Sequence, residues 1–419
     1  MKELELYLHI PFCVRKCAYC DFLSFPAGRQ EQDTYVKALM REAAAFPYKD
    51  AYEVTTVFFG GGTPSLLLPE QIAGLLEVLH REFHFADRPE VTIECNPGTV
   101  GSDAFEIYRQ AGVNRLSLGL QSADNSELLK LGRIHTWECF LETYQAARAR
   151  GFSNVNIDLM SALPGQTVAS WECTLKRVLA LKPEHLSAYS LIIEEGTPFY
   201  EAYAADDAVR AQGGKPRYLP SEDEERAMYE LTEELLGAAG LRRYEISNYA
   251  LPGYECRHNI GYWTGVEYAG FGLGASSMLR LPCDRENSLQ ARKTAGGKRE
   301  AGNIVQTDNI MERDGKCVRL RNPEDMHSYL AGDFSARECQ SLSREEEIEE
   351  FMFLGLRLTD GVSEQEFCSR FGCSMEEIYG EVLKKYCSIG LLMRKGGRVF
   401  LTPRGRDVSN TVMAEFLCS

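Results

Sequence analysis

The chain of 419 residues lacks any run of about 18 uninterrupted apolar residues, the length that a helix needs to cross a membrane. It also lacks an excess of positive charge, since 46 Lys and Arg residues stand against 61 Asp and Glu residues and the net charge is -15. These absences argue against a membrane-spanning protein and against a generic binder of nucleic acid or anionic membranes. Peripheral membrane association is left open, and an anionic ligand would need a local basic pocket.

The first residues, MKELELYLHI, lack the charged head, the continuous apolar run and the small-residue cleavage site of a secretory signal peptide. They alternate polar and apolar residues instead, as a strand does. We therefore expect a cytoplasmic protein in which the 14 cysteines stay reduced, most of them as plain buried or surface thiols.

Short apolar and β-branched runs recur along the first half of the chain with helix-like segments between them, which predicts an α/β fold with a parallel sheet. The predicted strands cover residues 4–10, 55–60, 91–95, 115–120, 154–160 and 185–191. Amphipathic segments at 69–83 and 136–151 predict helices between them. Six such repeats indicate a barrel or part of one.

The second half is organised differently, because the βα rhythm stops beyond about residue 305. Predicted helices at 345–358, 362–372 and 375–390 precede a predicted hairpin over 391–402, whose turn is Gly-Gly. This order indicates a winged-helix-like domain, so we predict one domain over 1–303 and a second over 304–419. Such domains often bind DNA, but the acidic run before this one favours a packing or lid role. Polar segments at 204–226 and 284–303 are predicted to be loops or mobile insertions.

Polar and glycine-rich segments follow the predicted strands, where parallel βα architectures place their reactive groups. The second strand leads into GGGTPS at 60–65, the third carries Glu94, the fourth ends near Gln121 and the fifth carries Asp158. Each has an ordinary explanation alone, as a tight turn, a surface carboxylate or a capping amide. Together at successive strand ends they predict one site on one rim.

The first strand leads into HIPFCVRKCAYCDF at 9–22, which holds three cysteines in a C-x3-C-x2-C spacing. A structural zinc site takes four protein ligands, and disulfides need cysteines in pairs. Three thiolates suit an iron–sulfur cluster in which one metal is left open. A zinc site completed by His9 is the alternative, and it leaves the other strand ends unexplained.

These segments, with RHNIGYW at 257–263 and the tail, resemble the radical S-adenosylmethionine (SAM) family of oxygen-independent coproporphyrinogen III oxidases and HemW-type haem chaperones. The resemblance covers nearly the whole chain and implies a partial (β/α)6 radical SAM barrel with a C-terminal winged-helix-like domain. It implies a 4Fe-4S cluster on Cys13, Cys17 and Cys20, whose fourth iron chelates SAM. An electron donor would reduce the cluster, which then cleaves SAM to methionine and a 5′-deoxyadenosyl radical.

The resemblance also implies which residues surround SAM. Gly61, Gly62 and Thr63 would let the backbone approach the methionyl amine, and Arg133 suits a carboxylate. The expected contacts are Tyr7, Tyr19, Gly61, Gly62, Thr63, Glu94, Gln121, Arg133, Asp158 and Ile192.

Two features separate the branches of the family. Phe22 stands where the decarboxylating oxidases carry a further cysteine, and HNIGYW at 258–263 matches the H-N-x-x-Y-W of the chaperones. The resemblance therefore implies a protein that binds haem and delivers it to haem-acceptor proteins. His258 is the best candidate ligand and Cys256 its rival, although a lone histidine is more often hydrogen-bonded within a core.

The alternative is a coproporphyrinogen III oxidase that decarboxylates propionates to vinyl groups, so whether the chain is an enzyme stays open here. Haem and coproporphyrinogen III both carry propionates, which need basic partners over the barrel mouth. The candidates are Arg242, Arg243, Arg257 and Arg280, which do not distinguish the two functions.

Overall fold

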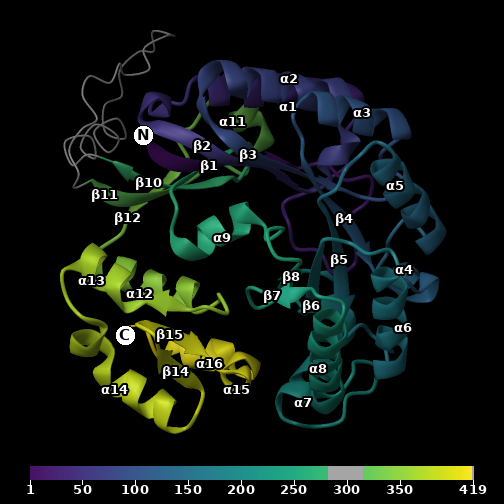
Figure 1. Cartoon of the computed structure of the whole chain (residues 1–419). Helices are drawn as coiled ribbons and strands as arrows, with labels where there is room; N and C mark the ends of the chain where they lie inside the picture. Colours follow the sequence, from purple (N-terminus) through teal and green to yellow (C-terminus); the bar gives the residue numbers. More distant parts are fainter. Residues whose placement is uncertain (282–314, 418–419) are drawn as a thin grey trace.

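The computed structural model of the chain describes residues 1–281 and 315–417 (Figure 1). Six parallel strands stand side by side in chain order and curve into part of a barrel. They are β1 (Lys2–Ile10), β2 (Tyr52–Gly61), β3 (His84–Cys95), β4 (Arg115–Gln121), β5 (Val155–Ser161) and β6 (His185–Ser190). All six predicted strands are thus confirmed.

Helices cover the outer face of these strands and bury the apolar side of the sheet (Figure 1). They are α1 (Arg29–Ala44), α2 (Pro69–Glu82), α3 (Ser102–Gln110), α4 (Asn125–Lys130), α5 (Trp137–Ala149) and α6 (Val168–Leu179). The two helices predicted at 69–83 and 136–151 correspond to α2 and α5. Val57, Ile93 and Ile157 are fully buried in the resulting core.

The sheet continues beyond both edges of the six strands without closing, which confirms a partial barrel. Next to β1 lie β9 (Tyr268–Phe271), β10 (Ser276–Leu281), β11 (Lys316–Arg321) and β12 (Glu338–Ser341), with α11 (Met326–Leu330) between the last two. Next to β6 lie β8 (Asn248–Ala250) and β7 (Arg242–Arg243). The predicted domain boundary at 303 and 304 falls outside the described residues, and the sheet reaches Ser341.

The prediction of a loop over 204–226 is wrong for much of that segment. Helix α7 (Pro198–Ala211) and helix α8 (Glu222–Ala238) occupy both of its ends. Ser221 caps α8 in a capping box with Glu224, and Trp171 Nε1 donates to Thr232 Oγ1 at 2.9 Å. The polar composition of this segment led to the wrong prediction because one face of each of these two helices is exposed to solvent. The polar segment at 284–303 lies outside the described residues.

A second core lies in the C-terminal part of the chain and confirms the winged-helix-like pattern. Its helices are α12 (Arg344–Gly355), α13 (Glu364–Phe371), α14 (Met375–Ser388), α15 (Pro403–Asp407) and α16 (Ser409–Ala414). Its small sheet consists of β13 (Val362–Ser363), β14 (Leu392–Lys395) and β15 (Arg398–Leu401). Gly396 and Gly397 form the predicted hairpin turn with φ of 62° and 73°. None of the helices described in either part is long and apolar enough to cross a membrane.

Candidate functional site

The three cysteines lie in a loop that follows β1 and is tied down at both ends. At its base, Cys13 N donates to Phe25 O at 3.1 Å and Phe25 N donates to Pro11 O at 3.0 Å. Farther along, Ala18 N donates to Leu131 O at 3.1 Å. Cys13, Cys17 and Cys20 are free thiols and are half-buried. The fold thus holds three thiols together at the carboxyl end of the first strand.

A cavity of about 530 Å³ opens at the carboxyl ends of the barrel strands, and we call it the mouth cavity. All predicted site residues except Tyr7 and His258 line it. They are Cys13, Cys17, Tyr19, Cys20, Gly61, Gly62, Thr63, Glu94, Gln121, Arg133, Asp158 and Ile192. The structure therefore brings these side chains together on one rim, as parallel βα topology requires.

Two of the thiols contact polar side chains from neighbouring strand ends. Cys13 Sγ lies 3.4 Å from Thr63 Oγ1, and Arg133 Nη1 lies 3.7 Å from Cys17 Sγ. Asn96 links these partners, because its Nδ2 donates to Thr63 Oγ1 at 2.7 Å and its Oδ1 accepts from Arg133 Nη2 at 2.6 Å. Asn96 was not predicted, although it follows β3 directly. The network places a positive charge at the edge of the three-thiol loop.

Two buried carboxyl groups line the mouth cavity. Burial, reinforced by Asp158, raises the pKa of Glu94 to about 8. Burial also raises the pKa of Asp158, whose oxygens accept from Ser117 Oγ at 3.2 Å and Asn156 Nδ2 at 2.7 Å. A cationic ligand would lower both pKa values and gain from both charges.

The two glycines at the end of β2 are required by packing against β1 and the start of the cysteine loop. Gly61 has φ of 107°, and a Cβ there would lie 2.5 Å from the His9 ring. A Cβ on Gly62 would lie 2.7 Å from Phe12 O. These contacts explain both glycines locally, and the close approach of a ligand amine stays a prediction.

Apolar side chains occupy the outer part of the mouth cavity. Ile192 is 68% exposed and Phe22 is 63% exposed, although both line the cavity. Deeper in, Tyr189 Oη donates to Gln121 Oε1 at 3.0 Å, which orients an amide on a backbone with φ of 73°. The inner part of the mouth cavity is therefore polar, and its outer part is apolar.

Tyr7 does not line the mouth cavity. Its hydroxyl lies 3.0 Å from His9 Nδ1, and its ring stacks on Phe58 at 6.4 Å between centroids. His9 Nε2 is 3.1 Å from Leu23 O, so both nitrogens of His9 already have partners other than a metal. Within residues 1–281 and 315–417, no three or more His, Cys, Asp or Glu side chains form a group that could hold a metal ion.

The HNIGYW segment forms α9 (Arg257–Thr264), which lies against the amino-terminal half of the barrel strands. His258 is 1% exposed, and its Nδ1 and Nε2 lie 2.6 Å from Thr56 Oγ1 and 3.1 Å from Tyr262 Oη. Burial, with the charge of Arg115, lowers the pKa of His258 to about 3. Neither ring nitrogen is open to a haem iron in this structure, so His258 as a ligand stays a prediction.

Two further positions of the segment are packed as tightly, Cys256, which precedes α9, and Gly261 within it. Cys256 is fully buried, and its Sγ donates to Glu90 Oε1 at 3.5 Å. A Cβ on Gly261 would lie 1.9 Å from Glu5 Oε1. The histidine and glycine of the segment are therefore explained by contacts within the barrel.

The four arginines expected over the barrel mouth are not among the residues that line the mouth cavity, so that expectation is wrong. Arg243 lies over the ring of Tyr249, and Arg257 Nη1 donates to Arg88 O at 2.8 Å. Arg280 pairs with Glu347 at 2.5 Å. These three arginines therefore serve contacts away from the mouth cavity that the sequence pattern did not reveal.

Comparisons with known proteins agree with this geometry. Residues 7–178 match the radical SAM superfamily, and residues 342–408 match the HemN C-terminal domain. The fold is similar to that of coproporphyrinogen III oxidase (HemN) from Escherichia coli, with a TM-score of 0.76 over 99% of this chain and 90% of that chain. The identity there is 22%, so the likeness concerns the fold alone. Partial barrel, strand-end cavity and three-thiol loop together define a radical SAM protein.

Relatives of similar length show to which family of radical SAM proteins the chain belongs. The chain is 34% identical to "Heme chaperone HemW" of Lactococcus lactis subsp. lactis, over 99% of this chain and 98% of that protein. It is also 34% identical to the protein of the same name from Bacillus subtilis, over 98% of each. The chain therefore belongs to the HemW family of radical SAM proteins. Its cofactors are accordingly a 4Fe-4S cluster and SAM.

Proposed function

We propose that this protein is a haem chaperone, which binds haem and delivers it to acceptor proteins. The observation that carries the proposal is the 34% identity, over nearly the whole chain, to relatives named as heme chaperones. Phe22 supports it, because an exposed phenylalanine lines the mouth where the oxidases carry a further cysteine.

For Cys13, Cys17 and Cys20 we propose the role of cluster ligands. The three free thiols fit a 4Fe-4S group because they line one cavity and each thiolate would bind a different iron. Three ligands need not converge on one point in that case. Thr63 and Arg133 would position Cys13 and Cys17 through the contacts described above. When bound, the cluster supplies the electron that cleaves the sulfonium of SAM.

The remaining wall of the mouth cavity suits SAM. Glu94 and Asp158 offer negative charge to its ammonium and sulfonium groups, and loss of their protons would be favoured by that cation. Tyr19 and Ile192 offer apolar surface to the adenosyl group. Gln121, held by Tyr189, offers a fixed amide.

We also propose that an acidic electron donor docks at the cysteine loop and that the protein works in the cytoplasm. Val14, Arg15 and Lys16 are exposed between the first two cluster cysteines, and Val14 is 55% exposed. Basic side chains on a chain of net charge -15 would steer an acidic partner to this place. The free cysteines suit a reducing compartment.

The cluster is tested by anaerobic reconstitution of wild type, Cys17→Ala and Cys173→Ala. Cys173 is an exposed thiol in α6 and is the matched control. Wild type and Cys173→Ala should hold about four irons and four sulfides per chain, and Cys17→Ala should not. Stoichiometric zinc without sulfide would contradict the proposal.

Haem delivery is tested by mixing the haem-loaded holoprotein with an apo-acceptor and following the acceptor's absorption spectrum. We expect haem to pass to the acceptor, and no vinyl product from coproporphyrinogen III with SAM and a reductant under anaerobic conditions. Decarboxylation without haem binding would favour the oxidase instead.

A further inference from the structure

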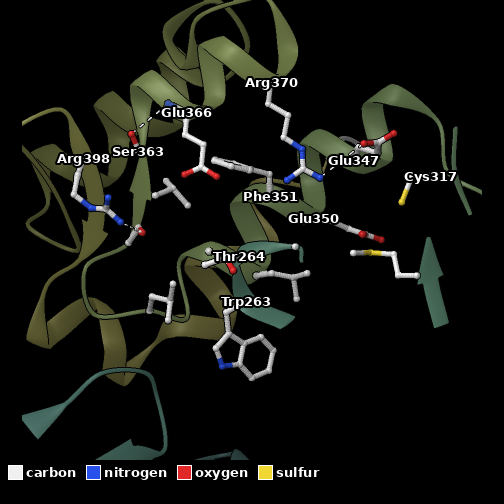
Figure 2. A pocket seen from close by; sticks show the side chains of 17 residues that line it. Trp263, Thr264, Cys317, Glu347, Glu350, Phe351, Ser363, Glu366, Arg370 and Arg398 are labelled. Carbon is white, nitrogen blue, oxygen red and sulfur yellow. Dashed lines mark hydrogen bonds and ion pairs between the residues drawn. The ribbon is translucent and has the colours of Figure 1, made fainter. Parts of the chain in front are cut away.

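Arginines border two cavities of the structure, and their contacts differ. The smaller cavity lies between the barrel sheet and α12 and measures about 60 Å³. It is lined by Arg370, whose guanidinium lies 3.9 Å from the carboxylate of Glu347 (Figure 2). In the mouth cavity, Arg133 contacts the backbone oxygen of Gly119, an amide oxygen and the sulfur of Cys17 instead. These contacts direct the charge of Arg133 toward the cysteine loop.

Asn96 lies between the two side chains that reach the cysteines. Its Oδ1 accepts from Arg133 Nη2 at 2.6 Å, and its Nδ2 donates to Thr63 Oγ1 at 2.7 Å. A guanidinium has donors only, so the amide oxygen must face Arg133 and the amide nitrogen must face Thr63. This orientation determines the direction of the contacts with the two sulfurs.

The hydroxyl of Thr63 keeps its proton available for Cys13. A hydroxyl carries one proton and two acceptor lone pairs, and Asn96 Nδ2 donates to one of these lone pairs. The hydroxyl oxygen lies 3.4 Å from Cys13 Sγ, and a thiolate can only accept, so the proton of Thr63 points to that sulfur. On the other side, Arg133 Nη1 donates to Cys17 Sγ at 3.7 Å. Asn96 therefore supports one donor on each of two sulfurs.

The position of Asn96 is itself fixed by its neighbours. Its backbone N–H donates to Ser65 Oγ at 3.2 Å, and its carbonyl oxygen accepts from Thr99 Oγ1 at 2.7 Å. Gly119 in β4 leaves room beside the amide, because a Cβ there would lie 2.9 Å from Asn96 Oδ1 and 3.1 Å from Arg133 Nη2. Groups at the ends of β2, β3 and β4 thus hold the amide in one orientation.

We propose that Asn96 is a positioning residue for the cluster, which aims the Thr63 hydroxyl at Cys13 and the Arg133 guanidinium at Cys17 and so raises the reduction potential. The proposal rests on the cluster ligands proposed above. Reduction by the electron donor adds one electron, and hence one negative charge, to the thiolate-bound cluster. Hydrogen bonds to the sulfurs stabilise that charge. Asn96 acts through Thr63 and Arg133, whose atoms contact the sulfurs.

The test is a redox titration of the anaerobically reconstituted full-length chain without SAM, in which electron paramagnetic resonance follows the reduced cluster. Wild type is compared with Asn96→Ala and with Asn410→Ala, a control in α16 where the side chain is exposed. We expect the equilibrium constant for one-electron reduction to fall at least tenfold in Asn96→Ala alone, which lowers the potential by about 59 mV or more. An unchanged potential at full iron content would overturn the proposal.

Iron content separates this proposal from the one on which it rests. Wild type that holds no cluster would contradict the cluster ligands themselves, whatever Asn96 does. Loss of iron from an Asn96→Ala chain whose circular dichroism matches wild type would support the positioning of Cys13 and Cys17.

A second arm does not depend on how Asn96→Ala folds. Thr63→Val removes the hydroxyl but keeps the shape, so its potential should fall, whereas Thr63→Ser keeps the donor and should keep the potential. Asn96→Ala should lower the potential less in a Thr63→Val background, because one of its two routes to the sulfurs is already lost. A wild-type potential in Thr63→Val, or an equal effect of Asn96→Ala in both backgrounds, would overturn the proposal.

Discussion

The mouth cavity and α9 both carry the polar side chains expected of a binding site, yet they use them differently. In the mouth, Glu94 and Asp158 line open space and are held with raised pKa values. In α9, His258 has both nitrogens bonded to neighbours and is 1% exposed. A polar motif therefore marks a ligand site only where its groups border open space, as in the mouth cavity.

The largest expected effect in this comparison is that of Gly261→Ala. The new Cβ would lie 1.9 Å from Glu5 Oε1, and Glu5 is itself buried at 2% exposure. We expect the free energy of unfolding to fall by about 3 kcal/mol or more, or the chain not to fold. Urea unfolding followed by circular dichroism measures this.

Its matched control is Gly237→Ala in α8, where a Cβ would meet no heavy atom within 4 Å. This variant should be neutral or more stable by up to about 1 kcal/mol. Equal stability of the two variants would contradict a packed role for α9.

The next effect is that of His258→Ala. It leaves the hydroxyls of Thr56 and Tyr262 without their partner and opens a cavity, so we expect the free energy of unfolding to fall by about 2 to 3 kcal/mol. SAM affinity should not change, and the exposed His327→Ala should leave both quantities unaltered. If His258→Ala kept its full stability but bound SAM poorly, His258 would be a ligand contact and not a packed residue.

Glu94→Ala should lower SAM affinity without lowering stability, which is the opposite of the result expected for His258→Ala. It removes a charged contact with SAM worth about 1.5 to 3 kcal/mol, so the dissociation constant should rise about 10- to 100-fold. Stability without ligand should not fall, because burial of the carboxyl disfavours its charged form. Equilibrium dialysis with labelled SAM measures the affinity, with the exposed Glu77→Ala as control. Unaltered SAM binding in Glu94→Ala would show that SAM lies elsewhere.

The last prediction concerns pH, and its effect is measured as a slope of stability against pH. Burial and the charge of Glu90 raise the pKa of Glu5 from 4.5 to about 9, so the folded state favours the protonated carboxyl. This stability is complete below pH 4.5 and is lost as pH rises toward 9, by at most about 1.4 kcal/mol per pH unit. Glu5→Gln should therefore gain stability relative to wild type between pH 6 and 9. A constant difference in urea midpoints across that range would contradict the protonated Glu5.

The barrel and its mouth were predictable because both follow from local patterns. Continuous apolar runs separated by amphipathic segments predict parallel strands, and parallel strands place their carboxyl ends together. Thr63, Gln121 and Asp158 could thus be placed on one rim before any contact was known. Asn96 shows the limit, since its role depends on two partners from other strand ends.

The place of α9 could not be predicted in this way. Its contacts join residues far apart in the chain, such as Thr56 with His258 and Glu5 with Gly261. The sequence shows a histidine among aromatic residues, but whether its nitrogens are bonded is a matter of tertiary packing.

The central claim is that SAM binds in the mouth cavity and not at α9. The most direct measurement is equilibrium dialysis of labelled SAM against the anaerobically reconstituted protein as wild type, Glu94→Ala and His258→Ala. Glu94 lines the mouth cavity and both nitrogens of His258 are bonded within the fold, so SAM binding should weaken in Glu94→Ala and stay at the wild-type level in His258→Ala. Weakened SAM binding in His258→Ala together with unchanged binding in Glu94→Ala would contradict the account.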